Sequence, residues 1–368
     1  QAIGEAASMD VVLVIDISES MANDRSLCDN DDDDGDGVAD DGRQSNSCPG
    51  TGLPPVAAVG DWDNYYADPS RCNANDNCQP FEKVKAAASS FAVRILDRPS
   101  SEEQDRLAIV TFSNGWESAS LNRGTRVVPP GWITDKTTAI NIIDDLEVYE
   151  PAICDTSVGP CRNYDPPGDP DGHYLGLACP AFIDTGDPSS CTTTNIGGGL
   201  KMGANMFATD SRPASLWVVV LLTDGAANAS DSAPPLDPYG YCPTATQSGS
   251  PFCRDDYSST YHSGGGSYDA DDFARDMADF VSCFPTNPEP ACNTSGQGAI
   301  MFAIGLGDQV LETYAAGDVA HGVSMLRYAA AVGYDSDPDT DPCEDKNLYV
   351  NGDNDSDGVH NWQEWCGN

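Results

Sequence analysis

Two hydrophobic patterns alternate along the chain. Short runs made almost entirely of apolar residues predict strands buried on both faces, and these runs lie at 9–17, 106–112, 216–222 and 299–306. Stretches with apolar residues three or four positions apart predict helices with one buried face, and they lie at 81–96, 136–146, 195–207, 271–284 and, in at least two pieces, 311–332. Two shorter strands are predicted at 125–132 and 347–350. The alternation predicts an α/β fold, with a doubly wound, mostly parallel six-stranded sheet and helices on both faces.

Three long segments interrupt this pattern and are rich in Asp, Asn, Pro and Gly. We interpret them as irregular loop insertions within one domain at 1–350, and they cover residues 22–80, 150–193 and 226–268. Residues 351–368 then form a separate acidic tail. The chain starts at Gln1 rather than Met, which favours a mature or trimmed product.

The cysteines indicate an oxidising compartment. There are 14 of them, an even number without any C-x-x-C pair, which argues against zinc and thioredoxin-like chemistry. None lies in a predicted core strand, and each irregular segment contains an even number, so each segment can be closed internally. We therefore predict seven disulfides between sequence neighbours: Cys28–Cys48, Cys72–Cys78, Cys154–Cys161, Cys179–Cys191, Cys242–Cys253, Cys283–Cys292 and Cys343–Cys366.

The net charge narrows the possible partners. With 59 acidic and 18 basic residues, the chain carries a formal charge of −41 at pH 7. Such a chain is repelled by nucleic acids and by anionic membrane surfaces. No apolar run approaches the roughly 18 residues of a membrane-spanning helix, so no insertion into a membrane is expected. Bound cations would reduce the repulsion between these negative charges. A halophilic protein surface is the alternative explanation of the acidic composition, but the clustering of the Asp residues favours bound metal.

One cluster of oxygen-bearing residues follows the predicted strands. Asp16, Ser18 and Ser20 come directly after the first buried run, and Asp224 follows the run at 216–222. Thr194 precedes the helix at 195–207. Open α/β sheets bind ligands where buried strands end, and carboxylates with hydroxyls suit Mg²⁺ or Ca²⁺. The alternative is that Ser18 and Ser20 cap a helix while Asp224 belongs to a plain turn.

These five residues, in this order and on these elements, resemble the von Willebrand factor A family and its metal-ion-dependent adhesion site. The resemblance implies that the first strand lies beside the strand that ends at Asp224, at the switch point of the sheet. It also implies a site made of Asp16, Ser18, Ser20, Thr194 and Asp224. One coordination position of the bound cation would stay open for a carboxylate from a protein partner.

Two further segments have the spacing of calcium-binding loops. The tail matches a twelve-residue loop whose ligands are Asp353, Asp355, Asp357, the carbonyl of Val359, Asn361 and Glu364. It is similar to the Asp-rich loops of thrombospondin type 3 and dockerin-like repeats. The first insertion repeats the spacing at Asp32, Asp34, Asp36, Val38 and Asp40. Arg43 replaces the final Glu there, which weakens this second prediction.

No catalytic motif accompanies these sites. The chain has neither H-E-x-x-H nor G-x-S-x-G, and Gly197, Gly198 and Gly199 lack the spacing of a phosphate-binding loop, so they predict close helix packing instead. We expect a non-enzymatic, extracellular or cell-surface binding domain. The alternative is a structural subunit of a filament or pilus, with neighbouring copies or pilus subunits as partners. A weaker resemblance, of the segments at 9–16 and 325–349 to prokaryotic pilus-associated surface proteins, points the same way.

Overall fold

The computed structural model describes residues 8–22, 68–97, 104–113, 125–154, 161–170, 173–178, 194–225, 227, 270–283, 296–306, 310 and 321–335. Seven strands are assigned in this part of the chain: β1 (Met9–Asp16), β2 (Arg106–Phe112), β3 (Arg126–Val127), β4 (Cys161–Asp165), β5 (His173–Ala178), β6 (Leu216–Thr223) and β7 (Ile300–Gly305). The helices are η1 (Glu19–Ala22), α1 (Pro69–Ala74), α2 (Phe81–Leu96), α3 (Lys136–Asp144), α4 (Ile196–Thr209), α5 (Ala270–Ser282) and α6 (His321–Asp335).

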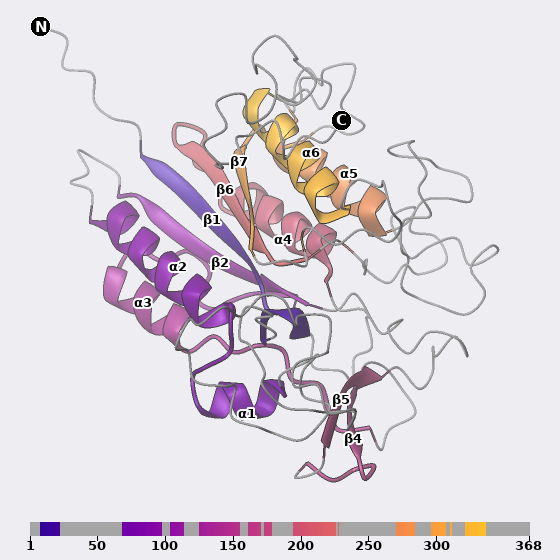
Figure 1. The fold of residues 1–368 in the computed structure, drawn as a ribbon. Helices are drawn as coiled ribbons and strands as arrows, with labels where there is room; N and C mark the ends of the chain where they lie inside the picture. The colour runs from indigo at the N-terminus through magenta and orange to yellow at the C-terminus, as the bar shows by residue number, and fades with distance from the viewer. Residues whose placement is uncertain are drawn as a thin grey trace, which may run out of the picture.

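The central sheet has five strands in the order β3-β2-β1-β6-β7 (Figure 1). β1 pairs in parallel with β2 and β6, β6 pairs in parallel with β7, and only the short β3 is antiparallel. The prediction of a mostly parallel α/β sheet is therefore confirmed. β3 is shorter than the strand predicted at 125–132, since Pro129 and Pro130 lack the N–H groups that a longer ladder needs. The strand predicted at 347–350 lies outside the described residues.

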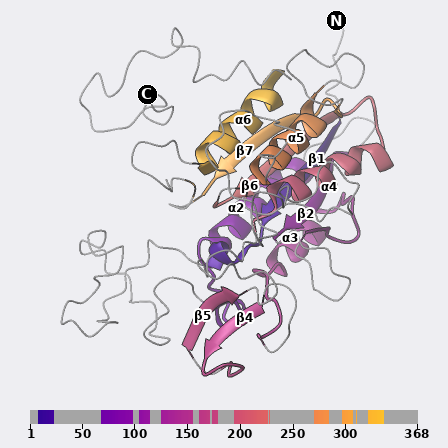
Figure 2. The same cartoon turned by 90° about the vertical axis from the view of Figure 1, so that its right-hand side faces the viewer.

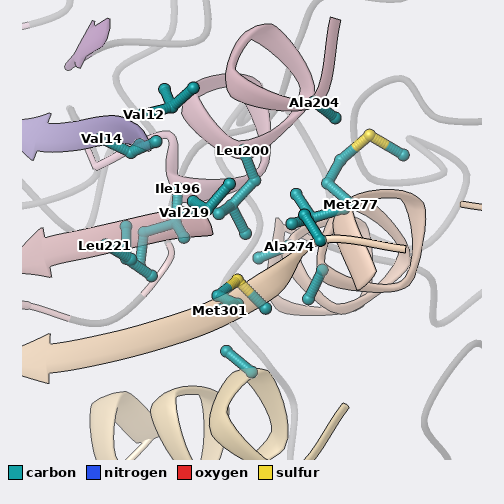
Figure 3. Close-up of a cluster of buried hydrophobic side chains, with 14 of the residues drawn as sticks. Val12, Val14, Ile196, Leu200, Ala204, Val219, Leu221, Ala274, Met277 and Met301 are labelled. Atoms are coloured by element: carbon teal, nitrogen blue, oxygen red, sulfur yellow. The ribbon is translucent and has the colours of Figure 1, made fainter. Parts of the chain in front are cut away.

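Alternate residues of β1 enter two different cores, because successive side chains of a strand point to opposite faces. Val12 and Val14 join the core formed with α4, α5 and α6. Figure 3 shows the α4 and α5 side of this core, where Val12, Val14, Val219 and Leu221 meet Leu200 and Met277. The residues between them face the other core, with α2 and α3. The apolar runs therefore predicted burial on both faces correctly for β1.

The glycines of α4 allow this helix to lie against its neighbours. A Cβ at Gly199 would come within 2.7 Å of Phe112 and 2.9 Å of Val14. A Cβ at Gly197 would come within 2.3 Å of Phe273 on α5. These distances are shorter than van der Waals contact, so any larger residue would push α4 away. The glycines serve packing, as the sequence suggested.

β7 differs from the prediction of a strand buried on both faces. Met301 is 3% exposed and contributes to the core, but Ile300, Phe302 and Ile304 on the opposite face are 36%, 56% and 44% exposed. β7 is the last strand of the described sheet, and no described helix covers this face of it as α2 and α3 cover β1 and β2. Sequence pattern could not show this, because a run of apolar residues does not reveal its position in the sheet.

Two segments predicted to be irregular contain regular structure. The short helix α1 lies inside the segment 22–80, and a two-stranded antiparallel hairpin, β4–β5, lies inside 150–193. The predicted disulfides Cys72–Cys78 and Cys154–Cys161 are both present. Cys283 is also disulfide-bonded, and its predicted partner lies outside the described residues. The remaining predicted pairs lie outside them too.

A buried ion-pair cluster lies at the amino-terminal end of β1. Asp10 is fully buried and accepts hydrogen bonds from Arg106 Nε at 3.0 Å and Nη2 at 2.9 Å, and it also contacts Arg212. The Arg106 guanidinium lies 4.1 Å from the ring centroid of Trp132. This cluster joins β1, β2 and the segment before β6 at the end of the sheet opposite Asp16.

Candidate metal centre

The carboxyl ends of β1 and β6 lie side by side. Ile15 is paired with Leu222, so Asp16 and Thr223 follow at the same edge of the sheet. The next residues turn away from the sheet, with Ser18 and Ser20 on one loop and Asp224 on the other. Two loops distant in sequence are therefore brought together by parallel pairing, at the place where such sheets bind ligands.

A chain of hydrogen bonds connects four of the five predicted site residues. Ser18 donates from its backbone N–H to Asp16 Oδ1 at 2.8 Å, and the Ser18 and Ser20 hydroxyl oxygens lie 2.9 Å apart. The Ser20 hydroxyl donates to Asp224 Oδ1 at 2.8 Å. These short contacts bring the side chains of Asp16, Ser18, Ser20 and Asp224 into one small region.

Thr194, the fifth predicted residue, lies beside the same loop. A Cβ placed on Gly225 would be 3.9 Å from both Thr194 Oγ1 and Cγ2. The following residue fixes this position, because Asn195 donates its backbone N–H to the Ser113 carbonyl at 2.7 Å. The Asn195 side chain also caps α4 by accepting from Gly198 N–H at 2.9 Å. The structure thus brings all five predicted residues to one end of the sheet.

The two carboxylates are buried. Asp16 is fully buried, Asp224 is 2% exposed and Thr194 is 4% exposed, whereas Ser20 is half-buried. Desolvation raises the pKa of Asp16 from 3.8 to about 6, against hydrogen bonds from Ser18 and Thr223 that lower it. The charged form of Asp16 is therefore costly in the absence of a compensating positive charge.

The donor set fits a hard cation. Two carboxylates and three hydroxyls supply only oxygen, which is what Mg²⁺ and Ca²⁺ prefer. Both carboxylate oxygens of Asp16 accept protein hydrogen bonds, Oδ1 from Ser18 N–H and Oδ2 from the Thr223 hydroxyl. No group of three or more His, Cys, Asp or Glu side chains suited to a metal occurs among the described residues, and this set has only two. A cation here would be held largely by hydroxyls.

Sequence reasoning missed residues that support this set. The Thr223 hydroxyl donates to Asp16 Oδ2 at 2.6 Å, and Gly225 N–H donates to Thr223 Oγ1 at 3.3 Å. Thr223 lies next to Asp224, so its position at a strand end was a usable signal. Glu19 lies between the two serines and is bonded to Tyr174 on β5. Nothing in the sequence indicated that contact, because it joins residues 155 positions apart.

The two predicted calcium loops, at Asp32–Asp40 and Asp353–Glu364, lie outside the described residues, so they stay predictions. Among the described helices, none has the length and apolar composition needed to cross a membrane.

Comparisons with known proteins give only distant similarities. No family model matches the chain, and no curated protein matches it. A solved structure of a mutant PilB minor pilin from Streptococcus sanguinis aligns with a TM-score of 0.41 and 16% identity over 91% of this chain, which spans 57% of that pilin chain. The von Willebrand factor domain of the type V pilus tip protein Mfa5 from Porphyromonas gingivalis aligns with a TM-score of 0.30 and 13% identity, over 79% of this chain and 57% of that one.

Proximal thread matrix protein 1 from the mussel byssus aligns with a TM-score of 0.27 and 14% identity, over 63% of this chain and 34% of that one. Similarity at this level carries no functional argument. The functional reasoning therefore rests on the geometry of the site.

Proposed function

We propose that the chain is an extracellular, metal-dependent protein-binding domain of the von Willebrand factor A type. One observation carries the proposal: oxygen side chains from three separate segments converge at the carboxyl ends of β1 and β6. The carboxylates of Asp16 and Asp224 are buried there, beside the hydroxyl groups of Ser18, Ser20 and Thr194. Two buried carboxylates at one place favour a positive charge nearby.

Mg²⁺ or Ca²⁺ would supply that charge. The Ser18 and Ser20 hydroxyls would hold the cation directly, Thr194 directly or through water, and Asp16 and Asp224 largely through water. Ser20 is the most exposed of these residues, so the partner would approach from its side. The cation would offer an open position to a carboxylate of the partner, in a partly desolvated place where a single charge contact is strong. The proposal involves no catalytic step.

Disulfides and calcium loops would support this domain. Cys72–Cys78 and Cys154–Cys161 are consistent with an oxidising, extracellular location. Calcium at the tail loop, and at the loop in the first insertion, would neutralise part of the large negative charge. The disulfides and the bound calcium would therefore serve the stability of the domain rather than the recognition of a partner.

The test is a count of bound ions. Protein stripped of metal is titrated with Mn²⁺, which substitutes for Mg²⁺ and Ca²⁺, and bound ions are measured by electron paramagnetic resonance. Asp224→Ala should bind one ion fewer than the wild type, and it should lose EDTA-reversible capture of extracellular proteins. Asp144→Ala, which removes an exposed carboxylate from α3, is the matched control and should behave as the wild type. Equal stoichiometry in Asp224→Ala and wild type would refute the metal site.

A second candidate, a structural subunit of a filament or pilus, is favoured by β7. Ile300, Phe302 and Ile304 form an exposed apolar row on the last strand of the described sheet, and such strands pair readily with other chains. The partner would be a neighbouring copy of the chain. Sedimentation over a range of concentrations distinguishes the candidates: Phe302→Lys should abolish assembly if the row is an interface, and a wild type that stays monomeric at all concentrations excludes it.

A further inference from the structure

The β4–β5 hairpin contacts the loop that carries Ser18 and Ser20. Figures 1 and 2 both show the hairpin beyond one end of the central sheet. The side-chain contacts identify this end as the carboxyl end of β1. Glu19, between the two serines, is 7% exposed, and its Oε1 accepts a hydrogen bond from the Tyr174 hydroxyl. Tyr174 lies on β5 and is 1% exposed.

The Tyr174 hydroxyl is held in the donor form. Burial, followed by the negative charge of Glu19, keeps the pKa of this phenol well above its usual range. A buried carboxylate that accepts from a neutral hydroxyl forms a charge-assisted hydrogen bond, which is stronger than a neutral one. The contact therefore restrains Glu19, which lies between Ser18 and Ser20 in the loop of the proposed metal site.

Tyr174 is itself fixed by the hairpin and α1. Its ring lies 5.4 Å from the Tyr164 ring, and the Tyr164 hydroxyl donates to Asp68 Oδ2 at 3.1 Å. Arg162 Nη1 donates to the Tyr164 oxygen at 3.2 Å. Asp68 caps α1 by accepting from Ser70 N–H at 3.0 Å. Cys72–Cys78 links α1 to the segment that follows it, and Cys154–Cys161 links the start of β4 to the segment that precedes it.

Ile17, the other neighbour of Ser18, is held by β2 and by Tyr149. Ile17 donates its N–H to the Phe112 carbonyl at 2.9 Å, and its carbonyl accepts from Tyr149 N–H at 2.7 Å. Asn73 of α1 holds the segment around Tyr149, donating to the Val148 carbonyl at 2.8 Å and accepting from Val148 N–H at 3.0 Å. Both neighbours of Ser18 are thus restrained, Glu19 by the hairpin and Ile17 by β2 and by the segment that Asn73 of α1 holds.

We propose that Tyr174 is a positioning residue for the metal centre: by fixing Glu19, it holds the Ser18 and Ser20 hydroxyls in the arrangement that a cation needs. This inference rests on the proposed metal site. A loop ordered before metal arrives binds with less loss of conformational entropy, and outer contacts of this kind typically change metal affinity by 10- to 100-fold. The disulfide-bonded hairpin would then act as a support of the metal loop rather than as a passive insertion.

The test compares two one-atom deletions in the same hairpin. Tyr174→Phe removes the hydroxyl bonded to Glu19, and Tyr164→Phe removes the hydroxyl bonded to Asp68. Mn²⁺ affinity is measured at the site that Asp224→Ala eliminates, together with the melting temperature in EDTA. We expect Tyr174→Phe to weaken Mn²⁺ binding about tenfold. Tyr164→Phe keeps the ring that packs against Tyr174 and leaves the Tyr174–Glu19 hydrogen bond in place, so its affinity should stay within twofold of wild type. If Tyr174 had only a structural role, both substitutions would lower the melting temperature and both variants would bind Mn²⁺ with the same affinity.

A double-mutant cycle shows whether Tyr174 acts through Glu19. In a Glu19→Ala background, Tyr174→Phe should cause no additional loss of affinity. The inference is overturned if Tyr174→Phe binds Mn²⁺ as well as Tyr164→Phe does, or if its effect is undiminished without Glu19. A wild type with the same Mn²⁺ stoichiometry as Asp224→Ala overturns the proposed metal site itself, and this result is distinct from the other two.

Discussion

Asp16→Asn should stabilise the metal-free protein while it weakens metal binding. Asp16 is fully buried, and the rise of its pKa from 3.8 to about 6 corresponds to about 3 kcal/mol against the ionised form in the folded state. Asn has nearly the same shape and can keep the hydrogen bonds to Ser18 N–H and to the Thr223 hydroxyl, which can rotate to accept. The substitution removes the buried charge and leaves the packing intact.

The gain should depend on pH in a defined direction. The folded protein holds the Asp16 proton more tightly than the unfolded chain does. The contribution of this proton to stability is fully present below pH 3.8 and is lost as the pH rises through about 6. Relative to wild type, Asp16→Asn should therefore be more stable by about 3 kcal/mol at pH 7.5, and by about half that at pH 5.

Urea unfolding in EDTA at the two pH values measures this difference, with exposed Asp144→Asn as the control that should change little. Adding Mn²⁺ should then reduce the difference, because wild type gains RT ln(1 + [L]/Kd), about 2.7 kcal/mol at a hundredfold excess over Kd, and the variant gains less. The reasoning is wrong if Asp16→Asn is less stable than wild type in EDTA at pH 7.5. It is also wrong if Mn²⁺ stabilises both proteins equally.

Two further predictions concern regions away from the metal centre. Asp10→Asn should lower the free energy of unfolding by about 3 kcal/mol, because it leaves the charges of Arg106 and Arg212 without their buried partner. Its Mn²⁺ affinity should equal that of the wild type, because Asp10 lies at the end of the sheet opposite the metal centre. A changed affinity would contradict this separation. Glu364→Gln should reproduce much of the fall in melting temperature that EDTA causes, because it removes the bidentate ligand of the predicted tail loop. A calorimetric melting curve unaffected by both calcium and EDTA would show that the tail binds no calcium.

The sequence was sufficient wherever a local pattern has one physical solution. The run Val11–Ile15 forms a strand buried on both faces as predicted, and the helix at 81–96 has the predicted bounds. The disulfides between close neighbours, Cys72–Cys78 and Cys154–Cys161, needed only short loops to close. The order of Asp16, Ser18, Ser20, Thr194 and Asp224 along strand ends, together with the resemblance to the von Willebrand factor A family, predicted that they would meet.

Tertiary structure decided what depends on neighbours distant in sequence. The exposure of Phe302 follows from the place of β7 as the last strand of the described sheet. The same run of apolar residues could equally form a strand that is buried on both faces. The raised pKa of Asp16 follows from burial, which the motif does not encode. The contact between Tyr174 and Glu19 requires the hairpin to fold back onto the end of β1. Such contacts have no sequence periodicity, because they join segments whose spacing along the chain is arbitrary and only the assembled sheet brings them together.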